Sequence, residues 1–238
     1  MTLRRRALAA LVALTAFATG TATARAQGPL FVPVPTPAVL NFEPLSTAAG
    51  CDANGFTAYG GLTWTGWGAI NKLECGSADV GGPHNGYWNG TRSGHNTGYL
   101  QLPRFAIDPF QALVGSITNA DGFDLLDAWM TAAWTNGLAV HVDAYRGLTL
   151  VGSTNFVVNY GGPSHVVFNF INITGARFSA SGGTPNYDLG GVGNQLVLDD
   201  ANVAIYPHVA VPEPATVGLV AIGLIALSAI ARRRARDA

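Results

Sequence analysis

The chain has 238 residues, of which only 11% are charged, and its formal net charge is −1. Its charges are unevenly placed: residues 27–210 hold five Lys and Arg against twelve Asp and Glu, a net charge of about −7. Because nucleic-acid binding rests on cationic contacts to phosphates, this acidic body argues against a nucleic-acid partner. It is compatible with neutral glycans or with divalent cations.

The first 26 residues have the three parts of a secretory signal peptide. Arg4, Arg5 and Arg6 precede an apolar stretch over residues 7–18. Ala24 and Ala26 form a small-x-small cleavage pattern before Gln27. We therefore predict a signal peptide at 1–26 and an exported chain. A retained membrane anchor is the alternative, but the apolar core is short and ends in the cleavage-like pattern.

Residues 27–38 form a leader in which prolines recur between Pro29 and Pro37, too densely for regular structure. We place the start of the folded domain near Val39 and its end at 208. The domain is long enough for a single core, and its Gly- and Asn-rich composition with little charge is typical of a β domain.

Cys51 and Cys75 are the only cysteines. An exported chain meets an oxidising environment, so we predict a disulfide between them that staples the N-terminal part of the domain. A catalytic thiol or a metal site is the alternative. Two cysteines without a close-spaced pair or a His motif match neither pattern.

Glycine-rich stretches after Cys51 carry an unusual number of aromatic residues. Trp64, Trp67, Tyr87 and Trp88 are candidates for a glycan platform, because flat rings cover the apolar faces of sugars while nearby amides bond their edges. Trp88 is the strongest candidate, since Asn85 and Asn89 flank it. Packing of the same rings in a sandwich core is the alternative. Trp129 and Trp134 lie in a strand-like run, and we expect them in the core.

The strongest strand signal covers residues 138–145. Leu138, Val140, Val142 and Ala144 fall on one face, and His141, Asp143 and Tyr145 on the other. The break at 146–147 predicts an antiparallel hairpin to 148–151. Residues 121–122 predict a turn. Residues 123–134 could form a strand or a helix by their apolar content, and we predict a strand. Further strands are predicted at 155–160, 165–172, 176–180, 195–198 and 202–206.

Many short strands without a helix-length amphipathic segment predict an all-β fold, an antiparallel β-sandwich, and within that class a jelly roll. Two groups of carboxylates, Asp121, Asp124 and Asp127 and the adjacent Asp199 and Asp200, could supply oxygen ligands to Ca²⁺. Neighbouring strand residues point to opposite faces, so the second pair needs a bulge to chelate together. Solvated turn acids are the alternative.

We expect no enzyme, because the motifs of hydrolase elbows, zinc proteases and phosphate or dinucleotide loops are absent from the sequence. His141 and Asp143 share a strand face and could form an acid–base pair, although an outward polar stripe is what alternation requires. The alternative is an exported glycan hydrolase or lyase whose dispersed carboxylates converge in space.

The C-terminal 209–238 segment combines three features. Val211, Pro212, Glu213 and Pro214 come first, an uncharged span follows at 217–231, and Arg232, Arg233 and Arg234 come last. The span is short for the hydrocarbon core, but flanking residues can lengthen it, so we predict a single transmembrane helix with the arginines in the cytoplasm.

This order of parts resembles the sorting signal of PEP-CTERM proteins of Gram-negative bacteria. The resemblance implies recognition by an exosortase, cleavage near Pro-Glu-Pro, and delivery to the cell surface or an exopolysaccharide matrix associated with biofilm. Glu213 would be a recognition residue. The body, through residues 40–43, 123–145 and 196–200, resembles the jelly-roll domain of some PEP-CTERM proteins, which in turn resembles carbohydrate-binding modules. We therefore expect an exported structural protein of the surface or matrix, with glycan binding as an added function.

Overall fold

The computed structural model describes residues 34–47, 54–75, 84–101, 108–208 and Leu224. The first half of this chain forms short strands and two short helices: β1 Thr36–Leu40, β2 Asn54–Gly55, β3 Ala58–Tyr59, β4 Leu62–Thr65, β5 Trp67–Asn71, α2 Lys72–Cys75, α3 Gly86–Gly90 and β6 Asn96–Leu100. The second half forms longer strands: β7 Leu113–Ala132, β8 Thr135–Asn136, β9 Leu138–Arg146, β10 Thr149–Val158, β11 Ser164–Ser181, β12 Thr184–Pro185, the 3-10 helix η1 Tyr187–Leu189 and β13 Leu196–Ile205.

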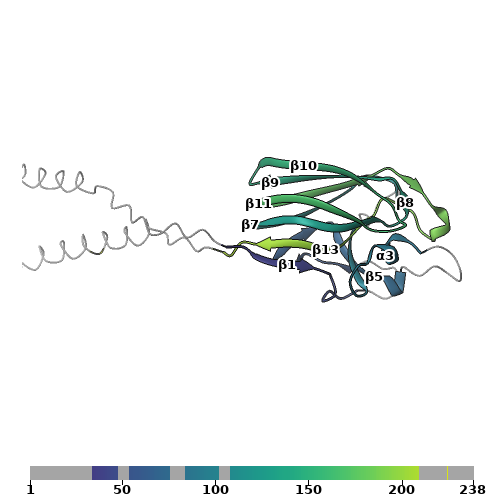
Figure 1. The fold of residues 1–238 in the computed structure, drawn as a ribbon, viewed down its shortest axis with the longest axis horizontal. Coiled ribbons are helices and arrows are strands. Elements are labelled where there is room, and N and C mark those ends of the chain that lie inside the picture. Colours follow the sequence, from purple (N-terminus) through teal and green to yellow (C-terminus); the bar gives the residue numbers. More distant parts are fainter. Residues whose placement is uncertain (1–33, 48–53, 76–83, 102–107, 209–223, 225–238) are drawn as a thin grey trace, which may run out of the picture. The chain divides into compact units, whose positions relative to one another are not determined.

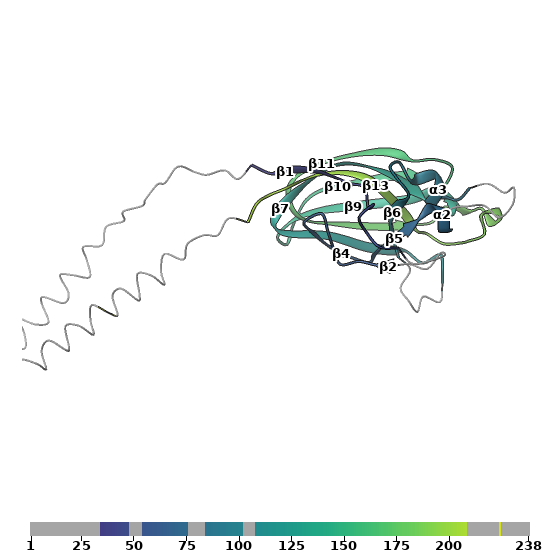
Figure 2. The ribbon, with the colours of Figure 1, turned by 90° about the horizontal axis from the view of Figure 1, so that it is seen from below.

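The main sheet is antiparallel and runs in the order β10-β9-β11-β7-β13-β6-β5-β2 (Figure 1). β1 adds to β13, and β4 adds to β7. β12 and β8 form a separate pair. The two helices lie beside each other at one end of the domain (Figure 2). The all-β, antiparallel architecture that the sequence predicts is confirmed.

The long strands β7 and β11 bend from one layer of the domain into the other. Phe168 and Phe178 both belong to β11, and their ring centroids are 6.2 Å apart. Ten residues of straight strand would span about 33 Å, so β11 folds back on itself. The β7–β11 register shifts three times near this bend, where Asn169 and Asn172 adopt positive φ. These two strands therefore form the corner of a sandwich-like arrangement.

The bend divides the sheet into two layers. β4 pairs with β7 at 116–118, and β9 pairs with β11 at 175–181, with β10 outside β9. We call this the first layer. The second layer contains 123–132 of β7, 164–173 of β11, and β13 with β1, β6 and β5.

The core lies between the layers and follows the alternation of the sequence. In β9 the residues Leu138, Val140, Val142 and Ala144 are at most 2% exposed, whereas His141, Asp143 and Tyr145 are half-buried. The alternation predicted for this strand is confirmed. It fixes which side chains face outward and hence where a ligand can reach the sheet.

Several predicted pairs of short strands are single bent strands. Residues 165–172 and 176–180 merge into β11, and 195–198 and 202–206 merge into β13. The turn predicted at 121–122 lies inside β7, where Gly122 has φ +99°. Polar and glycine residues do change the backbone direction at these positions. They produce a corner or a bulge within one strand, however, and not a chain reversal.

The first strand begins at Thr36, inside the segment predicted to be an irregular leader. β1 pairs with β13 from Thr36↔Ile205 to Leu40↔Ala201. Pro37 lacks an N–H group, but the described chain pairs β1 on one side only, where a proline is tolerated.

Candidate functional site

Trp64 and Trp67 do not form a glycan platform, which corrects that prediction. Each is 1% exposed. Their rings pack edge to face with centroids 5.4 Å apart, and the Trp64 Nε1–H donates to the Tyr59 carbonyl at 3.0 Å. A dissolved glycan cannot reach either ring. The core alternative is the correct interpretation for both tryptophans, because β4 and β5 turn these side chains inward.

Tyr87 is also buried, at 3% exposure, so its assignment to a glycan platform was wrong. Its ring packs edge to face against Tyr99 and Trp134, each with a centroid separation of 5.4 Å. Burial raises the pKa of the Tyr87 hydroxyl well above its usual value. Trp134 is buried as predicted.

Trp88 is half-buried on α3 and keeps part of its surface in water. The His84 ring stacks on it at 4.4 Å with an interplanar angle of 9°, and Lys72 Nζ lies 5.8 Å from its centroid. Asn85 caps α3 by accepting from the backbone N–H groups of Tyr87 and Trp88. A glycan role of Trp88 remains a prediction.

Trp129 was expected in the core but is half-buried on the outer face of the second layer. Arg92 lies over its ring at 4.3 Å, and the His165 ring lies 4.9 Å from it on the neighbouring strand. His165 Nε2 is 2.9 Å from Asp127 Oδ1, which also accepts from Asn202 at 2.6 Å. Arg92 thus lies over the Trp129 ring and the His165 ring is tilted against it, so both of these neighbours of Trp129 are polar.

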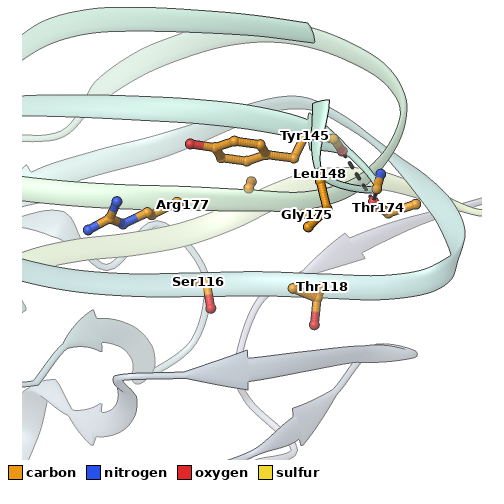
Figure 3. A pocket seen from close by; sticks show the side chains of 9 residues that line it. Ser116, Thr118, Tyr145, Leu148, Thr174, Gly175 and Arg177 are labelled. Carbon is orange, nitrogen blue, oxygen red and sulfur yellow. Dashed lines mark hydrogen bonds between the residues drawn. The ribbon is translucent and has the colours of Figure 1, made fainter. Parts of the chain in front are cut away.

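A groove of about 300 Å³ lies on the first layer, over β7, β9 and β11. Figure 3 shows Tyr145 on one side of it and Ser116 and Thr118 on the other. Arg177 lies toward one end, and Gly175 lies between the two sides. Leu148, in the β9–β10 turn, also lines the groove and is fully exposed. One aromatic ring, the hydroxyls of Ser116, Thr118 and Thr174, and a guanidinium thus line one accessible surface.

The Tyr145 ring is held in place by the polar stripe of β9. Its hydroxyl donates to Asp143 Oδ2 at 3.3 Å. The other oxygen, Oδ1, is 2.9 Å from His141 Nε2, and His141 Nδ1 is 2.7 Å from Asn155 Oδ1. The contact predicted between His141 and Asp143 is therefore present. Its geometric role is to orient Tyr145.

Arg177 keeps its guanidinium open to solvent. It lies opposite Asp143 in the β11–β9 register, but Asp143 is turned toward His141 and Tyr145. Within the described residues the Arg177 side chain makes no ion pair or side-chain hydrogen bond. Its donors are free for a ligand in the groove.

Sequence reasoning placed Tyr145 on the outward face of its strand but did not select it as a site residue. It missed Ser116, Thr118, Leu148 and Arg177 altogether. These residues come from three strands and a turn, and only the register of β7, β9 and β11 brings them together. The available signal was the alternation over 138–145, which marked an outward polar face.

The candidate calcium ligands do not gather. Asp121 contacts His208 at 2.8 Å, Asp124 accepts from the Asn172 backbone at 2.7 Å, and Asp127 belongs to the His165 network. Among the described residues there is no group of three His, Cys, Asp or Glu that could hold a metal ion.

Asp199 and Asp200 occupy the kind of bulge that their adjacency requires. The β13–β7 register shifts after Asp199, and Asp200 has φ +44°. Asp199 is fully buried and accepts from the backbone N–H groups of Arg92 at 2.7 Å, Ser93 at 3.1 Å and Asp200 at 2.9 Å. Burial nevertheless raises its pKa to about 7. The pair ties a loop to β13.

The dispersed carboxylates show no glycosidase geometry at the groove. Asp124 and Asp143 bond to their own neighbours, and Asp200 accepts from Ser93 Oγ at 2.7 Å. Among the described residues that line the groove, none is an acid. Two carboxyls flanking a cleft, which glycoside hydrolysis requires, are not found there.

The predicted disulfide involves one described residue. Cys75 is 5% exposed at the end of α2, and its carbonyl accepts from Asn85 at 2.7 Å. Cys51 lies outside the described residues. Its pairing with Cys75 remains a prediction.

Comparison with protein families decides the nature of the C-terminal segment. A family model described as PEP-CTERM protein-sorting motif matches residues 210–235. The chain carries a PEP-CTERM protein-sorting motif. The PEP-CTERM sorting signal predicted from the sequence is confirmed. The motif implies an exported precursor that an exosortase processes. In the described part of the chain, no helix has the length and apolar character needed to cross a membrane. The span predicted at 217–231 lies outside that part except for Leu224.

No curated protein matches the sequence. Among solved structures, the K1 cleaved adhesin domain of Lys-gingipain from Porphyromonas gingivalis W83 is similar over 72% of this chain and 99% of its own, with 9% identity and a TM-score of 0.41. TmCBM61 in complex with β-1,4-galactotriose is similar over 62% of this chain and 90% of its own, with 9% identity and a TM-score of 0.32. At such identities and TM-scores these matches assign no ligand or site to this chain.

Proposed function

We propose that this protein acts at the cell surface or in an exopolysaccharide matrix and binds a glycan through the groove over β7, β9 and β11. The observation that carries the proposal is the Tyr145 ring, fixed by Asp143, beside the open guanidinium of Arg177. The acidic character of the body also agrees with a ligand other than nucleic acid.

The groove supplies each interaction that a sugar needs. The Tyr145 ring offers an apolar surface for one face of a pyranose. The hydroxyls of Ser116 and Thr118 can donate and accept, and Arg177 donates through a planar fork. Gly175 has no side chain, which leaves space between the two sides: a Cβ atom there would stand 3.5 Å from Thr118 Cγ2.

The PEP-CTERM motif supplies the route to that location. We expect the signal peptide to be removed before Gln27 and the precursor to be held in the inner membrane by residues 217–231. An exosortase-type enzyme then cleaves near Pro212–Pro214. The intact mass of the protein from native cells, measured separately for membrane and extracellular fractions, tests this route. A chain that keeps 232–238 in every fraction contradicts it.

Glycan binding is tested by affinity electrophoresis of the protein in gels that contain the exopolysaccharide of its own cells, followed by titration with oligosaccharides released from it. Tyr145→Ala should weaken binding about tenfold, the equivalent of about 1.4 kcal/mol. Tyr187→Ala is the matched control, because Tyr187 is 71% exposed and does not line the groove. Unchanged binding in Tyr145→Ala together with loss in Trp88→Ala would move the site from the groove to α3.

A further inference from the structure

One continuous stretch of the domain contains no formally charged residue, although Asp143, Arg146 and Asp127 lie on the strands that pair with it. From Gly147 to Ala176 the sequence contains no Asp, Glu, Lys or Arg, although residues 27–210 carry seventeen such residues elsewhere. This stretch contains β10, the following turn and the first part of β11. All of its residues are described by the structure. We call it the uncharged side.

The uncharged side also holds two open strand edges. Within the described chain β10 pairs with β9 alone, and Figure 1 shows it at the outermost edge of the sheet. Residues 164–173 of β11 pair with β7 alone. The two edges adjoin each other, since the Phe156 ring of β10 lies 6.2 Å from the Phe168 ring of β11.

Natural sheets protect such edges with charges, prolines or bulges. β10 has a register shift near its start, between Leu150 and Gly152, but its register from 152 to 158 is continuous. Neither Lys nor Pro interrupts it. Six large apolar residues of the uncharged side are about half exposed or more: Leu148, Leu150, Val151, Val157, Val167 and Ile171. Open main-chain groups flanked by exposed apolar side chains are typical of a strand that receives another strand.

We propose that the uncharged side pairs two copies of this chain, with β10 of one copy antiparallel to β10 of the other. Each body carries about −7, so two copies repel wherever acidic surfaces meet, and the uncharged side is where this repulsion is smallest. Antiparallel pairing of identical strands has two-fold symmetry, so both copies bury the same residues. The paired edges satisfy main-chain groups that neither copy satisfies alone. The result is one sheet continuous across two molecules.

The test is sedimentation velocity of the full-length chain in detergent over increasing protein concentration. A concentration-dependent dimer is expected. Ser153→Lys and Val157→Lys each place a charge on an exposed position of β10 and should raise the dimer dissociation constant at least about tenfold. Val114→Lys is the matched control, because Val114 is 45% exposed on β7, an inner strand of the same layer.

Hydrogen exchange of the amides at 152–158 separates strand pairing from association through another part of the chain. These amides should gain protection as the dimer forms, and the gain should disappear in Val157→Lys. Far-ultraviolet circular dichroism checks that each variant is folded. A chain that stays monomeric at all concentrations, or a dimer that both β10 variants leave intact, overturns the proposal.

Discussion

The aromatic residues of 54–101 and those on the outer face of the first layer differ in their exposure to solvent. The first region is rich in rings, yet Trp64 and Trp67 are buried against each other, and Tyr87 is buried against Tyr99 and Trp134. The groove has a single ring, Tyr145, but presents it to solvent beside Arg177. A density of aromatic residues therefore says little about binding. What distinguishes the two regions is the face of the sheet on which each ring lies, and this depends on strand register.

Substituting a ring in each of the two regions should change the free energy of unfolding by very different amounts. Trp64→Ala removes a ring that is 1% exposed and contacts Phe42, Phe56 and Trp67. It should lower the free energy of unfolding by about 3–5 kcal/mol, because it leaves a large cavity. Tyr145→Ala should cost less than about 1 kcal/mol, since this side chain is only half-buried on the outer face. Urea denaturation of both variants measures the difference. Equal losses would remove the distinction between core and groove.

The carboxylate of Asp199 extends the comparison of buried and exposed groups, because it is an ionisable group that is fully buried. Its pKa is about 7 in the folded chain against a usual value of 3.8. Between these values the folded state holds a proton that the unfolded state has lost, so stability should fall as pH rises from about 4 to 7 and level off above that. The fall should be several kcal/mol, about 4 at most.

Urea denaturation of the wild type and of Asp199→Asn, each at a series of pH values, measures this dependence. The asparagine variant cannot ionise, so its pH dependence over this interval should be flatter. A wild-type slope that persists unchanged in Asp199→Asn would assign the effect to another group.

Two glycines on opposite faces of the first layer give a smaller contrast. A Cβ atom at Gly115 would stand 2.4 Å from Leu100 Cδ2 and 2.8 Å from Trp67 Nε1. Gly115→Ala should therefore destabilise the domain by about 1–3 kcal/mol through overpacking. At Gly175 the nearest atom would be 3.5 Å away, an ordinary contact, so Gly175→Ala should change stability by less than about 0.5 kcal/mol. Thermal unfolding followed by circular dichroism compares the two, and a Gly175→Ala loss as large as that of Gly115→Ala would contradict the assignment of faces.

The fold class could be predicted because each strand carries its own local pattern, as in 138–145. The continuity of β7, β11 and β13 could not, because Gly122, Asn169 and Asp200 give the same sequence signal for a turn as for a corner. The groove depends on the β9–β11 and β11–β7 registers, which join residues far apart in the sequence. The sorting motif, by contrast, is a contiguous linear signal and was readable without any structure.

The position of β13 in the sheet constrains when the domain can fold. Among the described residues β13 is the last strand in chain order, yet it pairs with β1, β6 and β7. A chain made and exported from its N-terminus leaves β1 without its partner until Ile205 has emerged. The sheet can therefore close only when β13 is available, a few residues before the segment at 210–235. The strand that completes the sheet and the sorting motif are thus adjacent in the sequence.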